Sequence, residues 1–311
     1  MDENLDNNKF LLVFKGNSFS KTYVRKYQRV LAFDLDETIG SFSDLNILWR
    51  GLNKLRKTAF ENKEIEQNEF NQILDIYPEF MRYGILNILE YLFIKKKRKE
   101  CDKFYLYTNN LCNPPWVELI INYIDYKLKI KEKLFDKTIC AFKINNKVLE
   151  LNRTTKDKTY GDFIKCTLLP KSTEICFIDN TYYENMLHEK VYFIQPRPYY
   201  HYLTMKQIIE RFILSKYGVK FMNDTQTNET IRDFLYDWFE LSNKSKIMRN
   251  EKNPNVDIIV AQKMMYHIKE FFYLTNRKNR SKKIRWKLSK TTRKYRANSV
   301  PSDSSDIEEI E

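Results

Sequence analysis

Three short, almost continuous apolar runs constrain the fold of this chain more than any other feature of its sequence. They are Arg29–Phe33 (RVLAF), Lys103–Tyr107 (KFYLY) and Glu174–Ile178 (EICFI). Such runs are typical of strands that are buried on both faces of a parallel sheet. Helical patterns separate them, including one with apolar residues at 85, 88, 89, 92 and 93. This alternation predicts an α/β fold, a three-layer sandwich whose helices cover both faces of a mostly parallel sheet.

Weaker patterns fill in the rest of the predicted sheet domain, which we assign to residues 1–203. Lys9–Phe14 and Val191–Ile194 have the composition of strands. Ile144-Asn145-Asn146 has the character of a hairpin turn between two short strands. The segment 39–77 follows the first apolar run and is polar and helix-like. We expect it to form a flap or a small cap.

The pattern changes after Thr204, where helical periodicity continues without strand candidates of similar quality. Apolar residues at helical spacing predict three helices within 204–275. We therefore expect residues 204–275 to form a helical appendage and residues 276–311 to form a disordered tail.

The positive charge of the chain is concentrated in that tail. The sequence contains 54 Lys and Arg against 41 Asp and Glu, a formal net charge of +13. Residues 276–296 hold eleven Lys or Arg and no acid, and residues 297–311 hold five acids and no base. A basic segment of this kind is suited to contact with nucleic acid or another polyanion. A purely solubilising tail explains the same composition, and both interpretations remain open.

Composition and motifs also exclude several classes of protein. No run approaches the ~18–20 apolar residues of a membrane span. The acidic, polar N-terminus lacks the features of a secretory signal, and the five cysteines form no CxxC pair. We therefore expect an intracellular protein, nuclear or cytoplasmic, without a disulfide framework or a zinc knuckle. No Gly-rich phosphate-binding loop is present. Abundant Lys, Asn, Ile, Tyr and Phe with few Gly and Ala are typical of an AT-rich genome, such as that of a large DNA virus or a eukaryotic parasite.

Polar residues follow each of the three apolar runs. Asp34 and Asp36 follow the first, Thr108 follows the second, and Asp179 and Asn180 follow the third. Ligands of open α/β sheets bind beyond the carboxyl ends of the strands, so we expect these side chains to share one crevice. Carboxylates in such a crevice are suited to Mg²⁺, and a nearby lysine would offset their charge and bind a phosphate.

These residues resemble the motifs of the haloacid-dehalogenase (HAD) superfamily. The stretch DLDET at 34–38 resembles motif I, Thr108 motif II, Lys165 the motif III lysine and Asp179 the motif IV acid. Within the superfamily, the sequence is most similar to phosphatases of the RNA polymerase II C-terminal-domain type, the NLI-interacting-factor-like branch. The resemblance covers roughly residues 28–200. Two features depart from the family: Thr181-Tyr182 follows the Asp-Asn pair in place of Ser-Pro, and segment 41–76 is helix-like in place of a β-hairpin.

The resemblance implies a role for each of these residues. Asp34 would form an aspartyl-phosphate, and Asp36 would act as general acid and base. Thr108 would hydrogen-bond the phosphoryl group, and Lys165 would neutralise charge, with Lys171 as a rival for that role. The metal ligands implied for Mg²⁺ are Asp34, the backbone carbonyl of Asp36, Asp179, Asn180 and, in an outer position, Glu184.

The sequence thus leads us to expect a Mg²⁺-dependent phosphomonoesterase, an enzyme of the HAD type. A phosphorylated macromolecule, most of all a Ser/Thr phosphoprotein, is the expected substrate. Two alternatives remain. One is a phosphatase of nucleic-acid ends that uses 276–296 to hold the polymer, and the other is a non-catalytic binding or scaffold protein that keeps a HAD fold.

Overall fold

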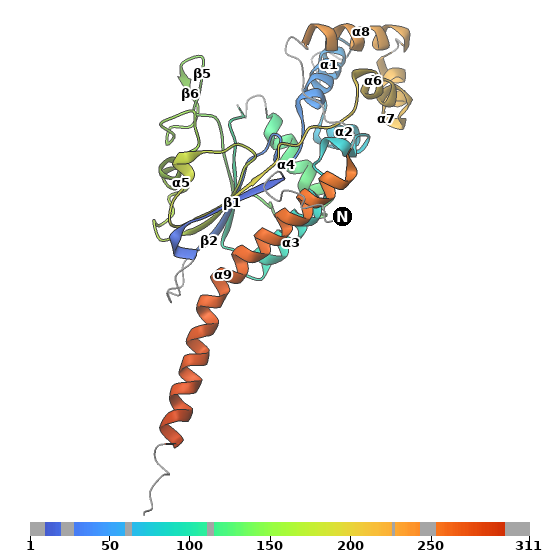
Figure 1. The fold of residues 1–311 in the computed structure, drawn as a ribbon. Helices are drawn as coiled ribbons and strands as arrows, with labels where there is room; N and C mark the ends of the chain where they lie inside the picture. The colour runs from blue at the N-terminus through green and yellow to red at the C-terminus, as the bar shows by residue number, and fades with distance from the viewer. Residues whose placement is uncertain are drawn as a thin grey trace, which may run out of the picture.

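The computed structural model describes residues 10–19, 28–59, 64–110, 115–225, 228–242 and 253–295. Figure 1 shows a sheet with helices packed around it. The sheet has six strands in the order β1-β8-β7-β2-β3-β4. Its strands are β1 Leu11–Lys15, β2 Arg29–Phe33, β3 Lys103–Tyr107, β4 Lys137–Ile139, β7 Glu174–Ile178 and β8 Val191–Pro196. Only the edge pair β1–β8 is antiparallel, and the other neighbouring pairs are parallel. The predicted α/β fold with a mostly parallel sheet is confirmed.

Nine helices surround the sheet within the described ranges. They are α1 Ser43–Ala59, α2 Gln67–Asp75, α3 Ile85–Lys97, α4 Trp116–Lys127, α5 Tyr160–Thr167, α6 Met205–Leu214, α7 Lys216–Thr225, α8 Asn228–Ser242 and α9 Pro254–Tyr295. The predicted hairpin is also present, formed by β5 Lys143–Ile144 and β6 Lys147–Val148. Asn145 and Asn146 make its two-residue turn with φ of 43° and 65°, which asparagine tolerates better than most residues.

Each central strand is buried on both faces because its alternate side chains enter two separate cores. In β2, Leu31 and Phe33 belong to a large core shared with α3, α4 and α9, whereas Val30 and Ala32 belong to a smaller core beneath α5. The same alternation holds in β3, β7 and β8. The nearly continuous apolar runs of the sequence therefore follow from a sheet with helices on both faces.

The segment after β2 forms helices. Helices α1 and α2 and the later helices α6–α8 contribute to one buried hydrophobic cluster, and Figure 1 shows α1, α6, α7 and α8 close together beyond one end of the sheet. Gly51 permits a close approach of α1 to α8, because a Cβ there would lie 2.7 Å from the Trp238 ring. The helices after Thr204 thus pack with the inserted segment 43–75 and, through α9, with the sheet itself.

Helix α9 differs from the expected tail. It continues through Tyr295, so residues 276–295 are helical, whereas 296–311 lie outside the described residues. The physical reason is that 255–295 contain neither Pro nor Gly, and Lys and Arg are good helix formers.

Two further findings concern membrane spans and cysteines. Among the helices of the described residues, none has the length and apolar content of a membrane span. Cys101, Cys166 and Cys176 are free, whereas Cys140 is disulfide-bonded.

Candidate functional site

The strand order brings the polar strand ends together. Strand β2 lies between β7 and β3, and Phe33 is in register with Ile178 on one side and Leu106 on the other. The backbone N–H of Asp34 donates to the Ile178 carbonyl at 2.9 Å, which extends the β2–β7 pairing to the first residue of the candidate site. Asp34 and Asp179 therefore emerge side by side at the carboxyl edge of the sheet, as the sequence predicts.

A buried lysine joins these two carboxylates, and it is Lys158. Its Nζ lies 2.5 Å from Asp34 Oδ1 and 2.6 Å from Asp179 Oδ2. Lys158 and Asp179 are each 1% exposed and Asp34 is 6% exposed. The three groups form a charge cluster that is almost completely shielded from solvent.

The prediction of Lys165 as the lysine of this site is wrong, because the lysine beside Asp34 and Asp179 is Lys158. Lys165 lies on the exposed face of α5, whose buried residues are Asp162, Phe163 and Cys166, and its rival Lys171 is also exposed. The helix begins at Tyr160, close to the carboxyl edge of the sheet, so Lys165 is displaced along α5 by ~10 Å from Lys158. Lys158 lies just before the N-cap residue Thr159, whose hydroxyl accepts from the Asp162 N–H at 3.0 Å. The Thr-x-x-Asp pattern at 159–162 is the signal in the sequence for the start of this helix.

Burial and neighbouring charge set the protonation of this cluster. Burial alone would lower the pKa of Lys158, but the carboxylates of Asp179 and Asp34 outweigh it and raise that pKa, so the ammonium stays charged. Burial raises the pKa of Asp179, against the opposing effect of Lys158. Lys158 is therefore the fixed positive charge of the site.

Asp36 occupies a different environment two residues after Asp34. Burial raises its pKa to about 6, the Asn110 hydrogen bond opposes that shift, and the charge of Asp34 adds to it. The Asn110 Nδ2 donates to Asp36 Oδ2 at 3.1 Å, and Asn110 follows Thr108 in the loop after β3. Asp36 is thus a carboxyl that changes protonation near neutral pH, held by the loop that the sequence assigns to motif II.

Thr108 is buried and its hydroxyl accepts from the backbone N–H of Asn110 at 3.0 Å.

Asn180 connects two loops: its Oδ1 accepts from the Thr38 hydroxyl at 2.9 Å, and its Nδ2 donates to Glu37 at 3.2 Å. Asn180 is thus engaged with the loop after β2. Glu184 is exposed in a short helical turn after this loop.

Two buried arginines, which no pattern in the sequence indicates, hold the loops of the site by their backbone carbonyls. Arg82 donates to the carbonyls of Thr38 at 2.6 Å and Glu37 at 2.5 Å, in the loop after β2. Arg153 donates to the Thr108 carbonyl at 3.1 Å and to the Lys156 carbonyl at 2.8 Å. Arg153 therefore ties the loop after β3 to the loop that ends in Lys158.

The donor chemistry of the cluster fits a hard cation. Asp34 and Asp179 supply carboxylate oxygens, and Mg²⁺ characteristically binds through one or two carboxylates with the remaining positions completed by water or substrate. Asp34 Oδ2 accepts no hydrogen bond among the described residues, whereas Oδ1 is engaged by Lys158. Within the described part of the chain, no group of three or more His, Cys, Asp or Glu side chains is arranged to hold a metal ion. The strand-end site itself offers two neighbouring carboxylates, Asp34 and Asp179.

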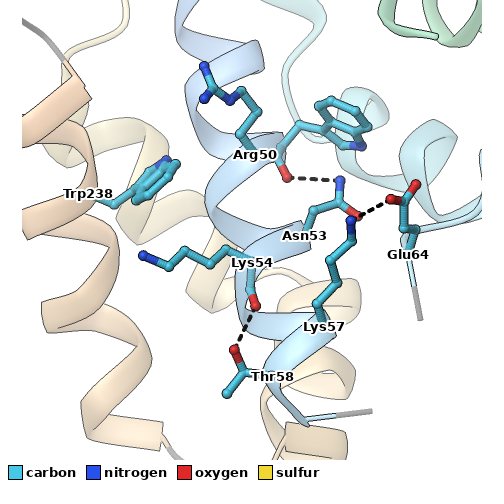
Figure 2. A pocket seen from close by; sticks show the side chains of 8 residues that line it. Arg50, Asn53, Lys54, Lys57, Thr58, Glu64 and Trp238 are labelled. Carbon is cyan, nitrogen blue, oxygen red and sulfur yellow. Dashed lines mark hydrogen bonds and ion pairs between the residues drawn. The ribbon is translucent and has the colours of Figure 1, made fainter. Parts of the chain in front are cut away.

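A hollow of about 460 Å³ lies between α1 and α8 (Figure 2). Arg50, Lys54 and Lys57 of α1 line it together with Trp238 of α8. The Lys54 ammonium lies 5.0 Å from the centre of the Trp238 ring, and Lys57 pairs with Glu64 at 2.5 Å. Two of its three cations are therefore already engaged with neighbouring groups, and none of the carboxylates of the strand ends lines it.

Comparison of the chain with family models, with curated proteins and with solved structures finds no significant match. The function must therefore be inferred from the geometry of the strand-end site and from the motif resemblance alone.

Proposed function

We propose that the protein is a phosphomonoesterase of the HAD type that acts through an aspartyl-phosphate on Asp34. The single observation that supports this most is the buried Lys158 ammonium between Asp34 and Asp179, with Asp36 two residues away. Burying three charges at a strand edge is costly for folding, and such arrangements occur where chemistry needs them. The resemblance of DLDET at 34–38 to motif I gives the same assignment.

The first step forms one bond and breaks one. A carboxylate oxygen of Asp34 attacks phosphorus, and the bond between phosphorus and the alcohol oxygen of the substrate breaks. Asp36, in its protonated form, donates its proton to that leaving oxygen, and a carboxyl with a pKa of about 6 is suited to this task near neutral pH. Lys158 stays charged and offsets the negative charge that gathers between Asp34 and the phosphoryl oxygens.

The second step releases phosphate. Asp36, now ionised, takes a proton from water as the water oxygen attacks phosphorus, and the bond to Asp34 breaks. The hydroxyl of Thr108 would hydrogen-bond the phosphoryl group, as the resemblance implies. Asp34, the backbone carbonyl of Asp36 and Asp179 would hold Mg²⁺, with Asn180 in contact through its remaining lone pair or through water. When bound, the ion would supply further charge neutralisation at the phosphoryl oxygens.

We further propose a phosphorylated macromolecule, with phosphoserine or phosphothreonine as the reacting group. The support is the resemblance to the C-terminal-domain phosphatases, and the β5–β6 hairpin that precedes α5 is short.

Hydrolysis of para-nitrophenyl phosphate with Mg²⁺ tests the proposed activity. We expect the wild-type chain to release nitrophenol and Asp34→Asn to lose the activity, because an amide oxygen cannot serve as the nucleophile. The matched control is Asp125→Asn, a half-buried carboxylate in α4 outside the strand-end site, which should keep the activity. Equal rates for the wild type and Asp34→Asn would contradict the proposal. A panel of phosphopeptides, 5′-phosphorylated oligonucleotides and small phosphate esters then identifies the substrate class.

A further inference from the structure

Helix α9 consists of two parts with different surroundings. Its first part, 254–275, packs on the sheet: Glu270 accepts from Lys15 at 2.7 Å and from the Tyr192 hydroxyl at 2.5 Å. The Phe271 ring lies against Tyr192, with ring centroids 6.0 Å apart. This part contains two basic and two acidic residues, so its net charge is zero. It belongs to the core of the protein.

The second part, 276–295, continues the same helix with ten Lys or Arg and no acid. It is about 30 Å long at 1.5 Å per residue. Figure 1 shows it in red, extending past the sheet and away from the helices at the opposite end of the molecule. Like charges three or four residues apart destabilise a helix, and a helix that is polar on all sides gains little from packing. Binding an anionic partner would remove this repulsion.

The end of α3 adds to this positive charge. Gly84 approaches Ala261 so closely that a Cβ on the glycine would lie 2.9 Å from the Ala261 Cβ. Eleven residues later in each helix, the Lys95 ammonium lies 5.4 Å from the centre of the Phe272 ring. The two helices therefore run parallel and in step, and the end of α3 lies beside the point where the basic part of α9 begins.

Three cations at that end, Lys97, Arg98 and Lys99, are exposed and make no ion pair among the described residues. Lys95 and Lys96, by contrast, pair with Glu100 and Asp136. The chain enters β3 at Lys103 directly afterwards, so these cations lie at the amino edge of the parallel strands. The candidate phosphatase site lies at the opposite, carboxyl edge.

We propose that Lys97–Lys99 together with residues 276–295 of α9 bind the phosphate backbone of nucleic acid. Ten cations and no acid over about 30 Å of helix form a dense positive charge, which suits a polyanion such as nucleic acid. The apolar residues of this part are Ile284, Trp286 and Leu288, too few for the apolar stripe that a membrane-surface helix needs. Binding depends on charge and not on base sequence.

Fluorescence anisotropy with a labelled DNA duplex of about 20 base pairs and no terminal phosphate measures this binding across about 50–200 mM salt. The wild-type chain should bind with a steep loss of affinity as salt rises. Replacing Lys282, Lys283, Arg285, Lys287 and Lys290 by Gln should weaken binding about tenfold or more and flatten the salt slope by several units. Replacing Lys97, Arg98 and Lys99 by Gln should reduce the slope by about one unit for each phosphate that the variant no longer binds.

The matched control is the triple substitution of Arg50, Lys54 and Lys57 by Gln, which removes three cations from the hollow in Figure 2. It should leave the affinity unchanged, because it leaves Lys97–Lys99 and residues 276–295 intact. Absence of duplex binding by the wild type at the lowest salt would overturn the proposal, as would an equal loss of affinity in the α1 triple variant. Binding to vesicles that contain phosphatidylserine in place of the duplex would identify a membrane surface instead.

Deletion of residues 297–311 gives a further arm of the same experiment. These residues carry five acids directly after the basic segment and would compete with the phosphates. The truncated chain should bind the duplex more tightly than the full chain at low salt. A weaker affinity after the deletion would contradict charge-driven binding. Since the duplex has no terminal phosphate, all these outcomes are independent of the proposed phosphatase activity.

Discussion

Lys158→Gln is expected to reduce the hydrolysis of a phosphomonoester about 10²–10³-fold, whereas Lys165→Gln should leave it unchanged. The ammonium of Lys158 lies 2.5 Å from Asp34 and 2.6 Å from Asp179, and its charge cannot be replaced by an amide. Lys165 is exposed on α5, and the ion pairs of both carboxylates are with Lys158. Steady-state kinetics of the two variants beside the wild type measure the difference.

The stability of the Lys158 variant distinguishes the loss of a charge from the loss of the fold. Removing one partner of a buried ion pair costs about 3–5 kcal/mol in typical proteins, because it leaves the other charge unpaired. Thermal unfolding of the variant should therefore be measured first, and its activity should be compared with that of the wild type at a temperature where both are folded. Adding Asp179→Asn to Lys158→Gln removes one of the unpaired carboxylates and should recover part of the stability without recovering activity. A fully active Lys158→Gln would refute the assigned role, and a reduced activity of Lys165→Gln instead would return that role to the α5 lysine.

Arg153→Lys is expected to lower the free energy of unfolding by about 3 kcal/mol or more and to reduce kcat. The Arg153 guanidinium is 2% exposed and donates to acceptors in three loops. These include the carbonyls of Thr108 and Cys140, at 3.1 and 2.8 Å, and of Lys156, at 2.8 Å. A lysine ammonium cannot span acceptors that a planar guanidinium reaches together, and each buried acceptor left unpaired costs about 1–3 kcal/mol.

We expect kcat to fall because Arg153 donates to the carbonyls of Lys156 and Asp157. These contacts hold the loop that carries Lys158. Urea unfolding measures the stability, and kinetics well below the midpoint measure kcat. Arg232→Lys is the matched control: its partner Glu210 lies 3.1 Å away and the arginine side chain is 49% exposed, so the effect should be close to zero. A stable Arg153→Lys with normal kcat would show that Arg153 does not position the lysine loop.

The sheet could be predicted from sequence because its strands are buried on both faces. Burial on both faces makes β2, β3 and β7 nearly continuous apolar runs, and parallel pairing places their carboxyl ends at one edge. The acids Asp34 and Asp179 could be assigned for the same reason. Each directly follows such a run, so an error of one residue in the strand boundary would still leave it at the edge.

The lysine could not be assigned as securely because it lies in a loop with no periodic pattern. Residues 149–159 connect the β5–β6 hairpin to α5, and they have neither apolar alternation nor helical spacing. Distance along the sequence favoured Lys165, but distance in space depends on where α5 begins. The N-cap at Thr159 decides that point, and it places Lys158 at the edge of the sheet.

The domain organisation depended on contacts between distant segments, which composition does not specify. Residues 204–275 have the helical periodicity of an appendage, yet α9 packs on β1 and β8, and α8 packs on α1. The aromatic residues of α9, such as Phe271, complete the core on one face of the sheet. The sequence shows that these residues need burial, but not which surface buries them.

Trapping the phosphorylated enzyme tests the central claim most directly. We expect a brief reaction of the Asp36→Asn variant with labelled para-nitrophenyl phosphate, stopped with acid, to leave label on the protein. This leaving group departs without a proton, whereas hydrolysis of the aspartyl-phosphate needs Asp36 as a base. Mass spectrometry should place the phosphoryl group on Asp34, and the double variant with Asp34→Asn should carry none. A phosphoryl group on another residue, or no label under conditions where the wild type hydrolyses the substrate, would contradict the account.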